Sequence, residues 1–316
     1  MSKTAFITGI NGQDGSFLAE QLVAKGYDVH GMVQRSAVFD RQNIDHIGQL
    51  TLHYGDLTDF SSLVRILKEV KPDEIYNLGA MSHVGISWQI PIYTAEATGV
   101  GVLNLLEAVR MTGLDARIYQ ASTSEMFSGK DKDKQNEDTQ LDPQSPYSVA
   151  KLFAHKMCQV YRKAYGMYIV SGILFNHESE RRGKNFVTRK ITTSIANILK
   201  GKQEKLYLGN IDAERDWGYA KDYTEAMWLM LQQDKPDDYV IATGETHSVR
   251  EFLEIAFKHV GLKWEDYVVI DENYVRPAET DRLIGDYSKA NKKFGWKPKT
   301  KFRELVKIMV EHDLNV

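Results

Sequence analysis

Short apolar runs alternate with amphipathic stretches along the first 175 residues. Helical patterns with one apolar face lie at 14–25, 59–70, 94–112 and 148–164. Strand-like apolar runs precede or follow most of them, at 3–9, 27–33, 50–54, 73–78, 116–122 and 167–174. Nearly continuous apolar strands that alternate with helices are typical of a parallel sheet covered on both faces. We therefore predict an α/β fold with a doubly wound parallel sheet.

The pattern changes after residue 175, where short strands and helices follow one another without regular alternation. A chain of 316 residues can hold a large α/β domain together with a smaller lobe. We expect residues 1–175 to form the sheet domain and residues 176–316 to form mainly a smaller, mixed α/β lobe. Some segments of the second part are expected to return to the sheet.

A glycine-rich turn joins the first predicted strand to the first predicted helix. Three glycines at a spacing of three allow a tight turn and a close approach of the backbone to a ligand. Free N–H groups at the start of the helix favour a pyrophosphate. Strand, glycine triplet and helix in this order predict a Rossmann-type domain. We expect this domain to comprise residues 1–175. The residues of this turn predicted to bind a dinucleotide are Gly9, Asn11, Gly12, Gln13, Asp14 and Gly15.

The residues after the second predicted strand indicate which dinucleotide binds. An NAD site usually places Asp or Glu here for the ribose hydroxyl, whereas an arginine suits the 2′-phosphate of NADP. No acidic residue follows this strand before Asp40, while Arg35 and Arg41 are both close to its end. We therefore predict NADP, with Arg35 at the phosphate.

Polar and small residues stand where the other predicted strands end. In a parallel sheet, ligands bind outside the carboxyl ends of the strands. The ends concerned are Asp56–Leu57, Leu78–Ala80 and Ser122–Glu125. We expect these three segments to border the same site as the glycine turn.

Tyr147 and Lys151 lie one helical turn apart, just after Pro146. Positions i and i+4 share a helix face, so the two side chains can meet. An ammonium beside a phenol favours the phenolate, which would lower the pKa of Tyr147 from about 10. Such a tyrosine could accept the proton of an alcohol. Taken alone, the pair is more often a chance surface pair, and the glycine turn reverses the balance in favour of the catalytic interpretation.

Composition and charge narrow the class of protein further. The net charge of −3 gives no reason to expect binding to nucleic acid or to an anionic membrane surface. The single cysteine, Cys158, excludes an intrachain disulfide framework and suits a reducing cytoplasm, where it is expected to be a buried core residue. No apolar stretch reaches the ~20 residues of a membrane span. No cluster of potential metal ligands stands out, so no metal is predicted.

Seven further motifs occur in order along the chain. They are Asn77–His83, Gln120–Glu125, Gly172–Ser179, Phe186–Ile191, Leu206–Asn210, Arg215–Gly218 and Arg276–Glu279. Together with the glycine turn and the Tyr147–Lys151 pair, this series resembles the GDP-mannose 4,6-dehydratase family, within the extended short-chain dehydrogenases/reductases. The resemblance runs from the first strand to the Gly-Trp-Lys-Pro298 stretch.

The resemblance implies a reaction and a role for four residues. The family converts a GDP-hexose to its 4-keto-6-deoxy product with bound NADP. Tyr147, supported by Lys151, would take the proton of the 4-hydroxyl, and Thr123 would hold the 4-oxygen. Glu125 would remove the C5 hydrogen and protonate the departing 6-hydroxyl. In the alternative interpretation Glu125 only caps the following loop.

The resemblance also implies residues for the cofactor and the nucleotide-sugar. Taken singly, each arginine among them could be ordinary surface charge. Beyond the glycine turn, the implied cofactor residues are Arg35, Asp56, Leu57, Leu78, Gly79, Ala80, Ser82, Tyr93, Lys151, His177 and Arg182. The implied substrate residues are Ser82, Asn176, Lys190, Asn210, Arg215, Arg276 and Glu279.

Members of this family pair two helices between subunits as a four-helix bundle, which implies a homodimer through 94–112 and 148–164. Three departures put a tetramer and the sugar in doubt. Gln34 replaces an arginine often found there, the loop 36–44 differs from the serine-rich form of relatives, and the segment 260–276 is short.

Three alternatives to GDP-mannose dehydration stay open from the sequence. The same motifs would serve a GDP-manno-heptose dehydratase. A sugar-nucleotide reductase or epimerase would have no use for Glu125. A dinucleotide-sensing binding protein would need neither Glu125 nor the Tyr147–Lys151 pair.

Overall fold

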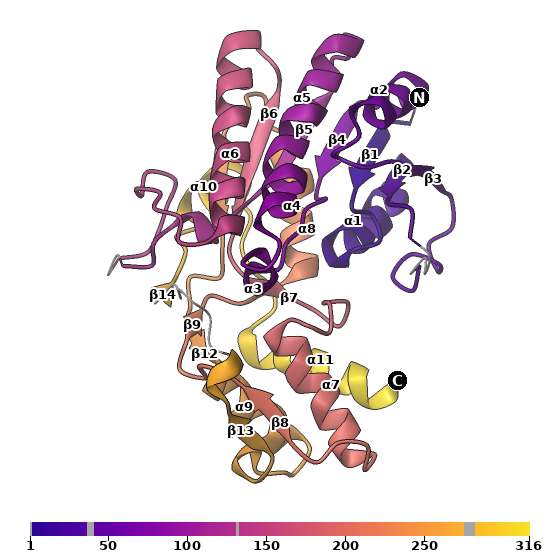
Figure 1. The fold of residues 1–316 in the computed structure, drawn as a ribbon. Coiled ribbons are helices and arrows are strands. Elements are labelled where there is room, and N and C mark those ends of the chain that lie inside the picture. The colour runs from indigo at the N-terminus through magenta and orange to yellow at the C-terminus, as the bar shows by residue number, and fades with distance from the viewer. Residues whose placement is uncertain (1, 37–40, 131–132, 275–281) are drawn as a thin grey trace.

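A parallel sheet of seven strands forms the centre of the protein (Figure 1). The computed structural model describes residues 2–36, 41–130, 133–274 and 282–316. The strand order is β11-β6-β5-β4-β1-β2-β3, and all neighbours are parallel. The strands are β1 (Thr4–Thr8), β2 (Asp28–Val33), β3 (Leu50–Tyr54), β4 (Glu74–Asn77), β5 (Arg117–Thr123), β6 (Ile169–Leu174) and β11 (Asp238–Ile241).

The predicted doubly wound sheet is confirmed. Six of its strands lie within two residues of the bounds predicted from the apolar runs. The seventh, β11, is absent from that prediction. It lies in the part of the chain after residue 175, where the pattern shows no regular alternation of strands and helices, and it pairs with the fully buried β6.

Helices cover both faces of the sheet. Helices α1 (Gln13–Ala24) and α8 (Ala220–Leu231) lie side by side on one face. Helices α2 (Phe60–Val70), α5 (Gly101–Thr112) and α6 (Pro146–Tyr165) cover the other. Successive strand residues point to opposite faces. Accordingly Ile7 packs with α1 and α8, whereas its neighbour Phe6 packs with α2 and α5.

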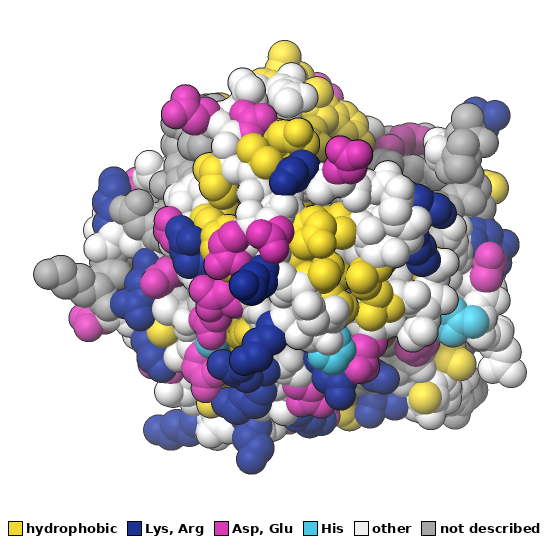
Figure 2. All heavy atoms as spheres, turned by 90° about the horizontal axis from the view of Figure 1, so that it is seen from below, with side chains coloured by type: hydrophobic (Ala, Val, Ile, Leu, Met, Phe, Trp, Pro, Cys, Tyr) yellow, Lys and Arg dark blue, Asp and Glu magenta, His cyan; other side chains and the backbone are white. Residues whose placement is uncertain are grey.

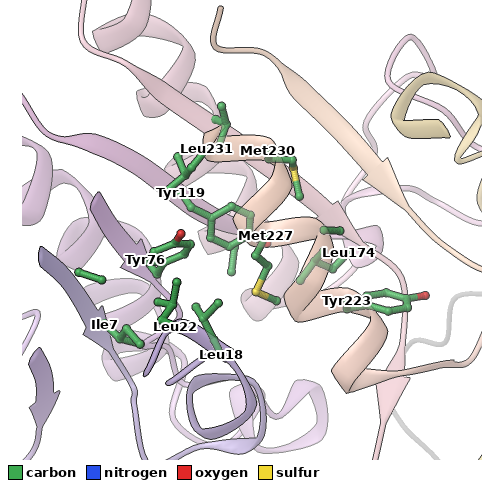
Figure 3. Close-up of a cluster of buried hydrophobic side chains, with 14 of the residues drawn as sticks. Ile7, Leu18, Leu22, Tyr76, Tyr119, Leu174, Tyr223, Met227, Met230 and Leu231 are labelled. Atoms are coloured by element: carbon green, nitrogen blue, oxygen red, sulfur yellow. The ribbon is translucent and has the colours of Figure 1, made fainter. Parts of the chain in front are cut away.

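The core under α1 and α8 is made of large apolar side chains (Figure 3). Leu18 and Leu22 of α1 and Met227 of α8 meet Tyr76 and Tyr119 from the sheet, and all five are fully buried. Burying a Leu or Met side chain contributes about 1.5–3 kcal/mol relative to exposure. This packing fixes α1, and with it the glycine turn that precedes it.

The predicted helix 94–112 is helical throughout in the structure, but it is not α-helical throughout. It consists of α4 (Pro91–Ala95), a π-helical stretch (Glu96–Val100) and then α5. A Cβ at Gly101 would lie 2.8 Å from the Cβ of Leu57. Glycine therefore lets the start of α5 approach the segment that follows β3.

Helix α6 begins two residues earlier than predicted, at Pro146. Ser145 caps it: the Ser145 hydroxyl accepts from the Ser148 N–H (3.1 Å), and the Ser148 hydroxyl accepts from the Ser145 N–H (2.9 Å). Proline is favoured at the first helical position because it needs no N–H there. The helix ends at Gly166, whose φ of 66° is the left-handed conformation that glycine adopts readily.

A lobe below the sheet has its own apolar core (Figure 1). It is built by α7 (Val187–Leu199), α9 (Val249–His259) and α11 (Phe302–Asn315), with the parallel pair β8 (Leu206–Leu208) and β13 (Val268–Ile270). Seen from below, its face carries Lys and Arg interspersed with Asp and Glu around a hydrophobic area (Figure 2).

The other α-helices and strands are short. They are α3 (Val84–Ser87), β7 (His177–Glu178), β9 (Glu214–Arg215), β10 (Gly218–Tyr219), β12 (His247–Ser248), β14 (Arg282–Leu283) and α10 (Ser288–Phe294). Of these, β12, β9 and β14 form a small sheet of their own. The division of the chain at residue 175 stays a prediction. Within the described residues, no helix is both long and apolar enough to cross a membrane.

Candidate active site

The glycine turn sits at the start of α1 and leaves that end of the helix open. Gly12 is the N-cap residue, and no side chain caps the helix there. A Cβ at Gly15 would lie 2.3 Å from the carbonyl oxygen of Gly9, and Gly9 itself has a φ of +70°. Only glycine fits these two positions. The turn therefore presents backbone N–H groups and a helix N-terminus, as a pyrophosphate requires.

The end of β4 is tied to the end of β1 beside this turn. The Thr8 hydroxyl accepts from the N–H groups of Leu78 (3.1 Å) and Gly79 (3.0 Å) and donates to the Asn77 side chain (2.6 Å). A Cβ at Gly79 would lie 3.2 Å from that hydroxyl. The two strand ends therefore border one site, as the sequence predicted.

Asp14 and His177 form an ion pair in the cleft. Nε2 of His177 lies 2.9 Å from the Asp14 carboxylate, and Nδ1 donates to the Phe175 carbonyl at 2.7 Å. Burial alone would lower the pKa of His177, but the Asp14 carboxylate outweighs it and raises the pKa above the usual 6.5. The pKa of Asp14 is lowered in turn: burial alone would raise it, but the His177 charge together with the hydrogen bonds from His177 and Gln13 outweighs burial. Both ring nitrogens of His177 therefore face acceptors.

Thr123 and Glu125 stand where β5 ends. The Thr123 hydroxyl accepts from the Glu125 N–H at 3.2 Å and caps a single 3₁₀ turn, Ser124–Met126. Both side chains are only 8% exposed. The carboxylate of Glu125 is near enough to Tyr147 to raise the pKa of its phenol. The turn thus holds a carboxyl group in the same cleft as the phenol, within reach of its charge.

The predicted effect of Lys151 on Tyr147 is wrong for the protein without ligands. Burial raises the pKa of Tyr147 to about 12, although a hydrogen bond with Thr123 opposes the rise. The Lys151 Nζ lies 5.9 Å from the centre of the Tyr147 ring and donates to the Ala121 carbonyl at 2.7 Å. Burial lowers the pKa of Lys151 to about 8, so the ammonium form still prevails at neutral pH. Desolvation of the phenol is the largest cause of its raised pKa.

One cleft of about 870 Å³ joins these groups to the lobe. It brings together almost every site residue predicted from the sequence. Its lining includes Gly9, Asn11, Gly12, Gln13, Asp14, Gly15, Asp56, Leu57, Leu78, Gly79, Ala80, Ser82, Tyr93, Thr123, Glu125, Tyr147, Lys151, Asn176, His177, Arg182, Lys190, Asn210 and Arg215.

Three predicted residues are not placed in this cleft. Arg35 lines an adjoining pocket of about 680 Å³, together with Arg65 of α2, and the two spaces share Gln34, Asp56 and Tyr93. Its lining is therefore next to the predicted cofactor cleft. Arg276 and Glu279 lie outside the described residues, as does Asp40.

The lobe supplies the other end of the cleft. Lys190 of α7 donates to the Tyr207 carbonyl (2.6 Å) and lies 4.0 Å from the centre of the Tyr274 ring. Burial lowers the pKa of Lys190. The buried side-chain oxygen of Asn176 has no hydrogen-bond partner among the described residues. A buried amide oxygen without a partner is costly, and a ligand that donates to it would remove the cost.

Some lining residues were not predicted as site residues. His83 caps α3 and packs against Phe186, with ring centres 4.9 Å apart and the rings tilted by 47°. Arg182 lies 3.6 Å above the centre of the Phe186 ring. Tyr274 also lines the cleft, as does Ser122, which belongs to a strand end expected from the sequence to border the site. His83 follows a predicted strand within a quoted motif, and this position could have indicated its place in the site. No local sequence feature indicated Tyr274, because only folding brings it to Lys190.

The cleft has the shape and polarity for a dinucleotide along the strand ends. The open helix end and the glycine turn fit a pyrophosphate, and the Arg35 pocket adjoins the end of β2. A buried carboxyl, a phenol and an ammonium meet at the end of β5, which is a set suited to moving protons. In the described ranges, no group of three or more His, Cys, Asp or Glu is arranged to hold a metal ion.

Solved structures with this fold include several sugar-nucleotide enzymes. UDP-glucose 4-epimerase of Thermus thermophilus, in complex with NAD, superposes with a TM-score of 0.88 and 27% identity over 98% of each chain. RMD of Pseudomonas aeruginosa, in complex with NADPH, has a TM-score of 0.83 at 23% identity over 99% of each chain, which speaks for the fold alone.

Sequence relatives are closer. The family described as GDP-mannose 4,6 dehydratase matches residues 6–309. GDP-mannose 4,6 dehydratase 1 of Arabidopsis thaliana is 55% identical, over 99% of this chain and 90% of its own. The Homo sapiens protein named GDP-mannose 4,6 dehydratase is 52% identical (99% and 91%), and the Vibrio cholerae protein named GDP-mannose 4,6-dehydratase is 50% identical (100% and 95%). The chain belongs to the GDP-mannose 4,6-dehydratase family.

Proposed function

We propose that the protein converts GDP-D-mannose to GDP-4-keto-6-deoxy-D-mannose and water, moving a hydrogen from C4 to C6. The observation that carries the proposal is the buried Glu125 carboxyl beside the Tyr147 phenol, at the end of β5. Oxidation of a hydroxyl needs one proton acceptor, whereas elimination of water needs a second acid–base group. Family membership supports the same reaction.

Tyr147 accepts the proton of the 4-hydroxyl in this proposal. The Thr123 hydroxyl, which already opposes the rise in the pKa of Tyr147, holds the sugar oxygen, and the Lys151 ammonium lies 5.9 Å from the centre of the Tyr147 ring. A ketone at C4 makes the C5 hydrogen acidic. Glu125 then removes the C5 proton and gives it to the departing 6-hydroxyl, so that water leaves and a C5–C6 double bond forms.

NADP is the cofactor that the residues fit. Gly12 and Gly15 would receive the pyrophosphate, Arg35 the 2′-phosphate, and Asp56, Leu57 and Leu78–Ala80 the adenosine side of the cleft. His177, Arg182, Ser82, Tyr93 and Lys151 would border the remainder. When bound, the nicotinamide supplies reversible hydride transfer. The UDP-glucose 4-epimerase structure with NAD, at 27% identity, supports a nicotinamide dinucleotide in this cleft.

The lobe end of the cleft would hold the GDP part of the substrate. Lys190 and Arg215 would meet the diphosphate, because guanidinium and ammonium groups bind phosphate oxygens. Asn176 would use its unpartnered amide oxygen on the ligand. Ser82, Asn210, Arg276 and Glu279 complete the proposed substrate residues.

The variant Glu125→Gln tests the proposal. Glutamine is nearly the same size but cannot accept and return a proton, and loss of such a group typically costs about 10²–10⁴-fold in rate. NADP binding and the fold should persist. Oxidation at C4 should survive in part, so the absorbance of reduced cofactor should rise on adding GDP-mannose. Full turnover by the variant would exclude the assigned role.

Isotope labelling and a substrate panel test the reaction itself. Deuterium placed at C4 should appear at C6 of the product, with one solvent hydrogen at C5. Solvent deuterium at C6 would contradict an internal transfer. Mass spectrometry after incubation with several GDP-sugars distinguishes a hexose from a heptose as the preferred substrate.

We further propose a homodimer through α5 and α6. Both helices expose large apolar side chains: Met111 is 64% exposed, Val149 54%, Phe153 41% and Val160 51%. A second copy related by a two-fold axis would cover them as a four-helix bundle. Sedimentation at micromolar concentration should show a dimer, and a monomer alone would refute the bundle.

We also propose a cytoplasmic location, with which the buried free Cys158 is compatible.

A further inference from the structure

A buried polar chain runs behind the catalytic end of the cleft and has no part in the reaction proposed above. His155 of α6 lies one turn beyond Lys151. Its Nδ1 is 2.9 Å from the Ser122 hydroxyl, and its Nε2 is 3.0 Å from the side-chain nitrogen of Gln159. That nitrogen is also 2.8 Å from the Asp238 carboxylate. His155 is only 2% exposed.

The far end of this chain fixes the direction of every hydrogen bond in it. The Arg162 guanidinium donates to Asp238 and, against the effect of burial, holds the pKa of that carboxyl below its usual value. A carboxylate only accepts, so the Gln159 NH₂ must face it. The same NH₂ faces His155, so Nε2 of His155 accepts. Burial lowers the pKa of His155, which leaves one ring proton, and that proton is on Nδ1.

The tautomer of His155 decides what the Ser122 hydroxyl can do. Because Nδ1–H donates to the Ser122 oxygen, the hydroxyl proton must point elsewhere. Ser122 lines the cleft, between Ala121, whose carbonyl accepts from Lys151, and Thr123. Among the residues that the structure describes, no acceptor for this proton is found. Ser122 is 4% exposed, so the proton has little access to solvent either.

We propose that Ser122 is a further ligand-binding residue, which donates its hydroxyl proton to an acceptor oxygen of a bound nucleotide. His155 is the positioning residue that aims this proton. The acceptor is an amide or hydroxyl oxygen, supplied by the cofactor or by the sugar. The inference rests on the proposed function for the identity of these two ligands, but the tautomer of His155 does not depend on it.

The tautomer is tested first, on the protein without added ligands. Imidazole nitrogen NMR of protein labelled with ¹⁵N-histidine, assigned with His155→Asn, should show a neutral ring protonated on Nδ1. In Gln159→Leu the constraint is lost while the Asp238 carboxylate remains 3.7 Å from Nε2, so the ring proton should shift from Nδ1 towards Nε2. A ring protonated on Nε2 in the unmodified protein would overturn the inference, whatever reaction the protein catalyses.

Ser122→Ala tests the hydroxyl, with Ser171→Ala as the matched control. Ser171 is a fully buried serine on the neighbouring strand β6 and does not line the cleft. Loss of one neutral hydrogen bond should weaken binding by roughly threefold to tenfold. Weaker NADP binding by calorimetry would identify the cofactor as acceptor. Unchanged NADP binding with a raised KM for GDP-mannose would identify the sugar. No change in either quantity would overturn the proposal.

Two substitutions of His155 separate positioning from packing. His155→Asn places an amide nitrogen near Nδ1 and should keep ligand affinity close to that of the unmodified protein. His155→Leu fills the space without a donor and should weaken the same ligand as Ser122→Ala. Equal losses in both variants would show that His155 only packs and would refute its positioning role. If the protein bound neither NADP nor GDP-mannose, the proposed function would fail while the tautomer result stood.

Discussion

The two ends of the cleft are built in different ways. At the sheet end, Thr123, Glu125, Tyr147 and Lys151 are each at most 8% exposed and come from one strand end and one helix. At the lobe end, the side chains come from α7, β9 and the segments after β6 and β8, and the Tyr274 ring is 52% exposed. The first set is fixed by local geometry and a shared core. The second is held together only by packing between distant segments.

The difference indicates a division of labour. Groups that move protons must be held within hydrogen-bond reach of the reacting atoms, which a strand end and a capped helix provide. Groups that bind a large, flexible nucleotide can come from separate elements. We therefore expect changes at the sheet end to affect turnover, and changes in the lobe to affect stability and binding.

The largest expected effect is at the sheet end. Tyr147→Phe removes the proton acceptor without changing the size of the side chain, and turnover should fall by about 10²–10⁴-fold. No absorbance of reduced cofactor should develop when GDP-mannose is added. Tyr165→Phe is the matched control, because Tyr165 lies on the same helix, 55% exposed, and should leave turnover unchanged. Retained turnover in Tyr147→Phe would contradict the assignment of proton transfer to the sheet end of the cleft.

The second prediction concerns the stability of the lobe. Arg189 of α7 donates to Asp313 of α11 at 2.6 Å, and both side chains are at most 8% exposed. Arg189→Met leaves a buried carboxylate without its main partner, which typically costs about 3–5 kcal/mol. Urea unfolding measures the loss. Arg250→Met breaks an exposed ion pair with Asp212 and should cost at most about 1 kcal/mol. Similar losses in both variants would show that burial of the pair is unimportant.

The third prediction concerns cofactor choice at the edge of the sheet end. Arg35→Ala should weaken NADP binding by about tenfold or more, since hydrogen bonds to charged groups contribute about 1.5–3 kcal/mol. NAD binding should change little, so the difference between the affinities for NADP and NAD should become smaller. Lys68→Ala, on the exposed side of α2, should change neither affinity. Equal affinity of the unmodified protein for both cofactors would exclude the assignment of Arg35.

The smallest expected effect is the pH dependence of the Asp14–His177 pair. The folded pKa of His177 is raised above its usual 6.5, so its stabilisation is complete below that pH and is lost as pH rises through the folded pKa. The pKa of Asp14 is lowered, so its part is lost only as pH falls below about 3.8 through the folded pKa. The melting temperature of the unmodified protein should therefore fall as pH rises through the folded pKa of His177. In His177→Gln this fall should be absent. An unchanged profile would show that the pair does not couple to folding.

Local sequence features predicted much of the fold and the site. Apolar runs placed six strands because a buried strand needs a continuous apolar stretch whatever its neighbours are. The glycine turn could be read directly, since Gly9 and Gly15 meet steric limits set within a few residues. The pairing of Tyr147 with Lys151 on one helix face followed from helical periodicity alone. Strand β11 was not predicted, because no local sequence feature indicates its pairing with β6.

Tertiary structure decided what the local pattern could not. The sequence predicted a lowered pKa for Tyr147, yet burial raises it, because desolvation depends on every segment that covers the phenol. The partnership of Asp14 with His177, and the chain from Asp238 to Ser122, join residues that are far apart in sequence. The sequence by itself determined which chemical groups this protein carries at the ends of its strands. Only folding decided which of them lose water and which face each other, because burial and long-range contacts are properties of the packed chain.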